Sequence, residues 1–163
     1  MYKINDYVIY QKNVCKIIDI KEKYIKDIDY YILEPMYDKS LKIKVPTNSN
    51  VICDIISVDT VNKIIENIPN INSLDIDDKN IETQYKVLLT NATPENLIKI
   101  IKTTYLRNKQ RLESKRKISD KDKSYFDQAE KYLYNEFSIA LNKSFDETKE
   151  YVINQVEKEL INE

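Results

Sequence analysis

The sequence predicts an α+β protein, in which a small antiparallel β-sheet or barrel domain is followed by a compact helical domain. Short runs rich in β-branched residues and tyrosine, separated by turn residues, fill the first part of the chain, as expected for strands. From about residue 58 onward, apolar residues recur at helical spacing instead. The predicted domains are residues 1–70 and 71–163, because a Pro/Asn cluster at residues 69–73 breaks the helical pattern.

Five strands are expected, at residues 7–11, 14–21, 28–34, 41–45 and 51–56. The fourth has the clearest pattern, because Leu41, Ile43 and Val45 alternate with Lys42 and Lys44. This period of two puts apolar side chains on one face and only lysines on the other. A lysine-faced strand in a small β domain favours a protein that docks on another macromolecule over one that turns over a substrate.

Helical spacing is expected to begin with a helix near residue 59, before the predicted domain boundary, and a second helix is expected at residues 80–90. Three later helices have start signals: Thr93 as N-cap before a proline, and capping-box patterns that begin at Ser119 and Ser144. The apolar stripes behind these starts are Leu97, Ile100, Ile101 and Tyr105, then Phe126, Ala129, Leu133, Phe137, Ala140 and Leu141, then Thr148, Val152, Val156 and Leu160.

The chain contains no glycine and no histidine. Without glycine there is no P-loop, no dinucleotide-binding fingerprint and no nucleophile elbow. Without histidine the usual catalytic triads lack their general base and the usual zinc sites lack a ligand. Cys15 and Cys53 are expected to be buried, small apolar residues in a reducing cytoplasm. The acidic clusters lie in predicted loops without a matched acid–base pair, so we expect no enzyme, no cofactor, no metal and no small-molecule substrate.

No apolar run approaches the roughly 18 residues that span a bilayer, and the N-terminus does not resemble a signal peptide. We therefore expect a cytoplasmic protein without a membrane partner. Charge is balanced overall but unevenly placed: residues 99–123 contain ten basic and three acidic residues, a net charge of +7, whereas residues 124–163 carry a net charge of −5. One basic segment of this kind favours local binding to a polyanion.

The N-terminal run YKINDYVIY, at residues 2–10, and the run KIKVP, at residues 42–46, resemble the CarD family of RNA-polymerase-binding transcription regulators. The β domain alone also looks like the polymerase-interacting domain of transcription-repair coupling factors. The similarity continues through residues 80–86, NIETQYK, which resemble the start of the family's DNA-contacting helix, and through residues 119–141, which match its long helix. It covers nearly the whole chain in the right order.

The resemblance implies a Tudor-like β domain that docks on a lobe of the polymerase β subunit. It also implies a helical domain that touches promoter DNA at the upstream edge of the melted bubble and changes the stability of the open complex. The polymerase contacts would fall on Lys23 and Lys44, with Lys42 on the same lysine face. Family members often have arginine there, and lysine keeps the charge but loses bidentate geometry.

On the DNA side, relatives place a tryptophan wedge at the position of Ile81, and this chain has no tryptophan. Two interpretations stay open for Ile81: a smaller wedge between base steps, or a core residue of its helix. Tyr85 is likewise either a DNA contact or a core residue, and Lys86 is the best single DNA contact. The basic segment is expected to add phosphate contacts or merely to be solvated. Its candidate DNA contacts are Lys99, Lys102, Arg107 and Lys123.

Two rival functions remain at this point. The chain could be an interaction module that binds polymerase or another protein without touching DNA. It could also be a free-standing nucleic-acid binder that works through its β domain. Tolerance of a Lys86→Ala change would favour the first alternative, and tight DNA binding without polymerase would favour the second.

Overall fold

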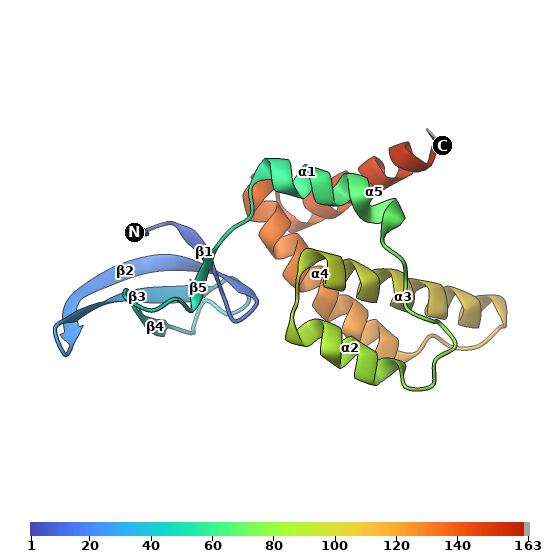
Figure 1. Cartoon of the computed structure of the whole chain (residues 1–163), viewed down its shortest axis with the longest axis horizontal. Coiled ribbons are helices and arrows are strands. Elements are labelled where there is room, and N and C mark those ends of the chain that lie inside the picture. The colour runs from blue at the N-terminus through green and yellow to red at the C-terminus, as the bar shows by residue number, and fades with distance from the viewer. Residues whose placement is uncertain (162–163) are drawn as a thin grey trace. The chain divides into compact units, whose positions relative to one another are not determined.

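The chain folds into one unit of strands and one unit of helices. The computed structural model describes the backbone of residues 1–161 and the side chains of residues 1–155. Two compact units, Met1–Ile56 and Ser57–Glu163, are separated at the point where the last strand is followed by the first helix (Figure 1). The predicted α+β class is confirmed at this level.

The first unit is a five-stranded antiparallel sheet with the order β4-β3-β2-β1-β5. Each expected strand is present within a few residues of its predicted position. The strands are β1 (Tyr7–Tyr10), β2 (Asn13–Ile25), β3 (Ile28–Pro35), β4 (Ile43–Pro46) and β5 (Ile52–Asp54). β2 and β3 form the long hairpin of the sheet, whereas β4 and β5 are short and lie at its two edges.

One face of the sheet carries the core of this unit. The buried core side chains are Val8, Cys15, Ile17, Tyr31, Leu33 and Val45. The N-terminal segment packs against them, because the Tyr2 ring meets the Tyr31 ring edge-on and the Tyr2 hydroxyl donates to Asp54 at 2.6 Å. That hydrogen bond raises the pKa of Tyr2 to about 12.

Two details of the β unit differ from the sequence prediction. β4 begins at Ile43, so Lys42 precedes the strand and Leu41 is exposed, because a turn in which Ser40 donates to the Asp38 carboxylate delays the strand. Of the two cysteines expected to be buried, Cys15 is in the core but Cys53 is exposed on the edge strand β5.

The second unit contains α1 (Val58–Asn67), the short 3-10 helix η1 (Ile68–Asn70), α2 (Ile81–Thr90), α3 (Pro94–Glu113), α4 (Asp120–Leu141) and α5 (Phe145–Ile161). The predicted N-cap hydrogen bonds are confirmed. The side chains of Thr93, Ser119 and Ser144 each accept a hydrogen bond from the backbone N–H three residues later. Ser57 does the same for α1.

The boundary between the units lies after Ile56, not after residue 70 as predicted. α1 belongs to the helical unit because Val61 and Ile65 are buried in it and Asn62 accepts a hydrogen bond from the Tyr151 hydroxyl of α5. The proline at position 69 therefore marks the turn of η1 rather than a linker between domains.

The buried faces of the helices match the predicted apolar stripes at most positions and differ at a few. On α3, Tyr105 is exposed, whereas Ile98 is buried together with Thr103 and Thr104. These threonines tolerate burial because their hydroxyls donate to the carbonyls of the preceding turn of the helix. The side chains of Val156 and Leu160 lie outside the described residues. None of the helices formed by residues 1–161 is long and apolar enough to cross a membrane.

Within residues 1–161 of this glycine-free chain, eight residues have positive φ. Asn5 and Asn142 fit the tolerance of asparagine for the left-handed region. The turn between β1 and β2 is different, because its two central residues, Gln11 and Lys12, have φ values of 46° and 70°. Two successive positive φ values are typical of a type I′ hairpin turn, where glycine is strongly preferred at the second position.

Lys12→Gly should raise the free energy of unfolding of the β unit by about 0.5–1 kcal/mol, because relief of left-handed strain exceeds the entropy cost of glycine. Urea unfolding of the full chain, followed by tyrosine fluorescence, would measure this gain. Gln128→Gly, at an exposed position within α4, is the control and should destabilise the helical unit instead. A loss of stability in Lys12→Gly would contradict the strain argument.

Candidate functional site

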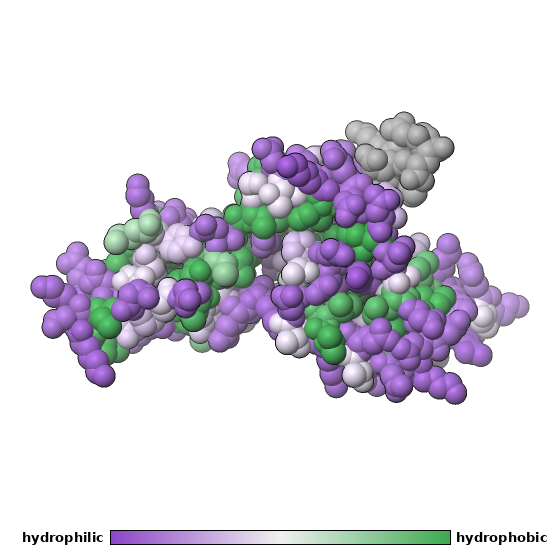
Figure 2. All heavy atoms as spheres, viewed as in Figure 1, coloured by the Kyte–Doolittle hydropathy of each residue, from purple (hydrophilic) through white to green (hydrophobic). Residues whose placement is uncertain are grey.

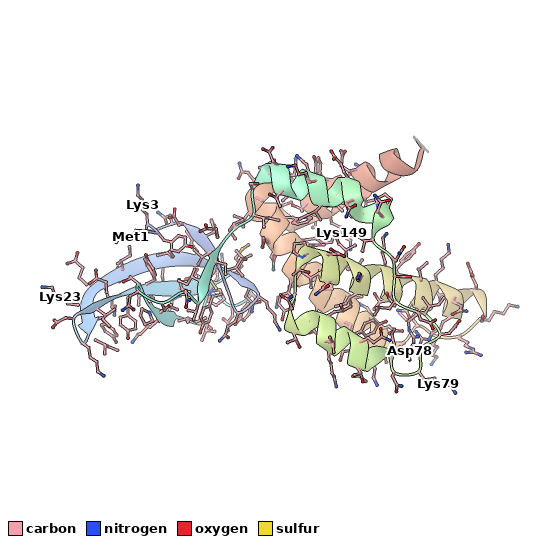
Figure 3. All side chains as sticks on the ribbon, viewed as in Figure 1. Met1, Lys3, Lys23, Asp78, Lys79 and Lys149 are labelled. Atoms are coloured by element: carbon pink, nitrogen blue, oxygen red, sulfur yellow. The ribbon has the colours of Figure 1, made fainter. Side chains whose placement is uncertain are left out.

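A bulge near the end of β2 displays Lys23. Lys21 pairs with Tyr30 and Ile25 pairs with Ile28, so three residues of β2 lie opposite the single residue Asp29 of β3. Lys23, the middle one, has a φ of 45°, and its backbone N–H donates to the Asp29 carboxylate at 2.8 Å. Figure 3 shows the Lys23 side chain near the bend that joins β2 to β3. Bulges of this kind re-aim side chains and recur at functional edges.

Beside the bulge, four side chains form what we call the lysine–tyrosine cluster: Lys21, Tyr24, Tyr30 and Lys44. The Lys44 ammonium donates to the Tyr24 hydroxyl at 2.6 Å, which lowers the pKa of Tyr24. The ammonium groups of Lys21 and Lys44 lie 5.1 Å and 4.9 Å from the centre of the Tyr24 ring. Tyr30 meets that ring edge-on at 5.6 Å. The cluster is a cationic, aromatic surface with a defined shape.

Lys42 stands apart from this cluster. Its ammonium forms an ion pair with the Glu34 carboxylate at 2.6 Å and donates to the Lys39 carbonyl. The hydrogen bond from Lys42 also lowers the pKa of Glu34. Of the three lysines expected to contact polymerase, Lys44 contacts Tyr24 and Lys23 directly precedes Tyr24 in the chain, whereas the charge of Lys42 is already compensated.

In the helical unit, the most constrained polar group is the buried carboxylate of Asp122. It is 2% exposed and accepts hydrogen bonds from Arg107, from Arg111 and from the Tyr85 hydroxyl at 3.1 Å. Burial by itself would raise the pKa of Asp122, but the hydrogen bonds from Arg111 and Arg107 outweigh it and hold the pKa below the usual value. Arg107 also donates to the carbonyl of Ile76, in the segment before α2. We call these groups the Asp122 network.

Four of the predicted DNA contacts therefore face the interior. Ile81 is 5% exposed and Tyr85 is fully buried, so the core interpretation holds for both in this structure. Arg107 is part of the Asp122 network. Lys102 donates to the carbonyls of Ile68 and Ile71, and burial lowers its pKa. Ile81 and Tyr85 are therefore buried, and Lys102 and Arg107 are partly buried and hydrogen-bonded within the unit, so none of the four side chains is freely exposed.

Sequence reasoning missed Asp122 as the partner of these groups. Its place in a capping-box pattern suggested that it would reach back to the N–H of Ser119, but that N–H donates to Asn108 instead. A signal was present in the spacing, because Asp122 precedes Ala129 and Leu133 by seven and eleven residues and so extends the apolar stripe of α4.

The cations that remain near α2 are Lys79, Lys86, Arg116 and Lys121, which we call the α2 cation group. Lys86 is well exposed. The Glu82 carboxylate forms ion pairs with two of these cations, with Lys86 at 3.8 Å and with Lys121 at 2.7 Å. Lys79 and Arg116 line a hollow of about 240 Å³ together with Arg107 and Arg111. Figure 3 shows Lys79, beside Asp78, on the loop that leads into α2.

The two other predicted DNA contacts lie away from this group. Lys123 pairs with Asp127 at 2.9 Å, one turn along α4, and Lys99 pairs with Glu95 at 3.8 Å in the first turns of α3. The basic segment at residues 99–123 is therefore not one continuous surface. Among the described residues, no group of three or more Cys, Asp or Glu side chains could hold a metal ion.

Asp122→Asn should destabilise the helical unit by about 2–4 kcal/mol at neutral pH, because two partly buried guanidinium groups lose their counter-charge. Since the folded-state pKa of Asp122 is depressed, its contribution is present above the unfolded value and is lost as the pH falls through the folded value. The difference in stability between wild type and Asp122→Asn should therefore shrink at acid pH. Urea unfolding at several pH values measures both effects.

Asp127→Asn is the matched control, because Asp127 lies on the same helix and pairs with a lysine at the exposed surface. It should change stability little at any pH. Equal losses in the two variants, or a difference that does not depend on pH, would show that the Asp122 network does not stabilise the unit.

Comparison with protein-family models and with curated proteins found no match for the chain. The resemblance to the CarD family therefore rests on the residues quoted in the sequence analysis. Two surfaces of the chain can contact a partner: the lysine–tyrosine cluster with its bulge, and the α2 cation group.

Proposed function

We propose that the chain is a transcription regulator of CarD type. In this proposal the first unit is a Tudor-like domain that docks on the β subunit of bacterial RNA polymerase, and the helical unit contacts promoter DNA at the upstream edge of the bubble. The observation that carries the proposal is the bulge in β2, which holds Lys23 in a left-handed conformation beside the lysine–tyrosine cluster. Strain of this kind tends to persist at functional sites.

The chemistry of the β-unit surface suits an acidic protein partner. Lys23 and Lys44 carry the charge, and the Tyr24 and Tyr30 rings offer rigid apolar area beside it. Tyrosine is enriched in interface hot spots, and burial of its ring against a partner would exclude water from the ion pairs beside it. The family resemblance assigns polymerase binding to Lys23 and Lys44. Lys44 belongs to this cluster and Lys23 directly precedes Tyr24 in the bulge, which supports the proposal.

The helical unit would hold DNA through its phosphates. Ile81 is buried, so a wedge at the fork is not part of the proposal. The α2 cation group supplies few charges, and Glu82 compensates part of them. A few phosphate contacts give weak, salt-sensitive binding, which becomes sufficient when polymerase tethers the protein near the promoter.

The proposed regulation is a difference in affinity between two states of the promoter. A factor that binds the melted promoter on polymerase more tightly than the closed one shifts the equilibrium toward melting. The shift can be no larger than that difference in binding free energy. Promoters whose open complex is unstable would respond most strongly.

Lys44→Glu should weaken binding to a purified β-subunit lobe fragment about tenfold or more, because a charge reversal at a contact with an acidic partner creates repulsion. Lys44→Arg should bind at least as tightly, since a guanidinium can form a bidentate pair. Isothermal titration calorimetry of the full chain with the fragment measures both. Lys12→Glu, in the turn at the other end of β2, is the control and should bind like the wild type. Failure of the wild type to bind the fragment would end this proposal.

Lys86→Ala should weaken binding to duplex DNA and reduce the slope of log affinity against log salt by about 0.9, the value for one phosphate contact. Fluorescence anisotropy with a labelled duplex, titrated at several low salt concentrations, provides the slope. Lys63→Ala, at an exposed position on α1, should leave the slope unchanged. An unchanged slope in Lys86→Ala would favour an interaction module that does not touch DNA.

A further inference from the structure

A groove of about 320 Å³ runs between the C-terminal half of α3 and the N-terminal half of α4. Its apolar lining comes from Tyr105, Leu112, Ile118 and Phe126. Leu112 is 62% exposed, Tyr105 58% and Ile118 39%, so large side chains of α3 and of the loop after it remain uncovered together. Figure 2 shows hydrophobic surface over α3 that is bordered by hydrophilic side chains. A contiguous exposed apolar area of this kind marks an interaction site.

The groove is separate from the surface proposed for DNA. The α3 residues that line it, such as Tyr105, Lys109 and Leu112, are three or four positions apart and share one side of the helix. Arg107 and Arg111, which point toward the Asp122 network, lie on another side of α3. On α4, the groove-lining residues are likewise on a different side from those that contact α2.

Two lysines line the groove, and further cations lie in the loop between α3 and α4. Lys109 and Lys123 line it, and only Lys123 has a carboxylate partner in the groove, Asp127. Within residues 1–155, the side chains of Lys109, Lys115 and Lys117 form no ion pair with any described residue. The end of the helical unit that contains the groove therefore combines exposed apolar side chains with uncompensated positive charge.

We propose that this groove binds an acidic, amphipathic segment of a partner protein. Apolar side chains of the segment, such as leucine or phenylalanine, would fill the space between α3 and α4, and flanking glutamates or aspartates would pair with Lys109 and the loop cations. This is helix-in-groove or extended-peptide recognition. DNA fits the groove less well, because phosphates gain nothing from exposed leucine and isoleucine. The inference does not depend on the proposed function and adds a protein-binding surface to it.

The test is a display selection of random-sequence peptides against the full-length chain, followed by affinity measurements on the enriched peptides. Enriched sequences should combine acidic residues with large apolar ones. Leu112→Asp should weaken their binding about tenfold or more, as expected from loss of a buried leucine contact. Lys109→Glu should also weaken it. Val87→Asp is the matched control, since Val87 is 65% exposed on α2, and it should bind like the wild type.

Several results would overturn the proposal. One is a selection that yields no binding peptide; another is peptides without an acidic excess; a third is peptides that bind Leu112→Asp as tightly as the wild type. Concentration-dependent dimerisation that Leu112→Asp abolishes would make a second copy of the chain the occupant. Displacement of the peptide by duplex DNA, with an equal loss of DNA affinity in Leu112→Asp, would assign the groove to nucleic acid.

Discussion

The buried carboxylate of Asp122 is the interaction on which the helical unit depends. It joins α4 to α3 through Arg107 and Arg111 and to α2 through the Tyr85 hydroxyl, and Arg107 extends the network to the segment before α2. A buried carboxylate without such partners would cost several kcal/mol, so the three helices are held in one arrangement. Arg107 and Arg111 of α3 bond to Asp122 and so do not add to the α2 cation group or to the groove. The remaining cations form two sets, the α2 cation group and the lysines at the groove. Both candidate surfaces of this unit follow from that division.

The β unit depends on a different constraint, the conformation of its backbone in a chain without glycine. Lysine, glutamine and aspartate take left-handed conformations at its tight turns and at the bulge of β2. At the turns this conformation only closes a hairpin. At the bulge it also determines which way Lys23 projects, and the Asp29 carboxylate holds the backbone there. The contacts of the lysine–tyrosine cluster also join the neighbouring side chains at this exposed surface.

Local patterns predicted the elements of this fold well. The turn residues located the strands, and the caps at Thr93, Ser119 and Ser144 located three helices, because these signals act over a few residues. Pairings between distant residues were not predictable in this way. A count of charges could not tell that Lys102 and Arg107 bond inside the unit, since their partners are carbonyls and a carboxylate far along the chain. The boundary was placed too late for the same reason: only packing on α4 and α5 assigns α1 to the helical unit.

The central claim is that the two units use separate surfaces on one assembly, the β-unit surface for polymerase and the α2 side for DNA. Hydrogen–deuterium exchange of the full chain, free and bound to bacterial RNA polymerase on a promoter fragment, tests this claim most directly. The account predicts slower exchange in the β2–β3 hairpin around Lys23 on addition of polymerase, and slower exchange around α2 only when DNA is also present. Unchanged exchange in the hairpin, with protection elsewhere or nowhere, would contradict it.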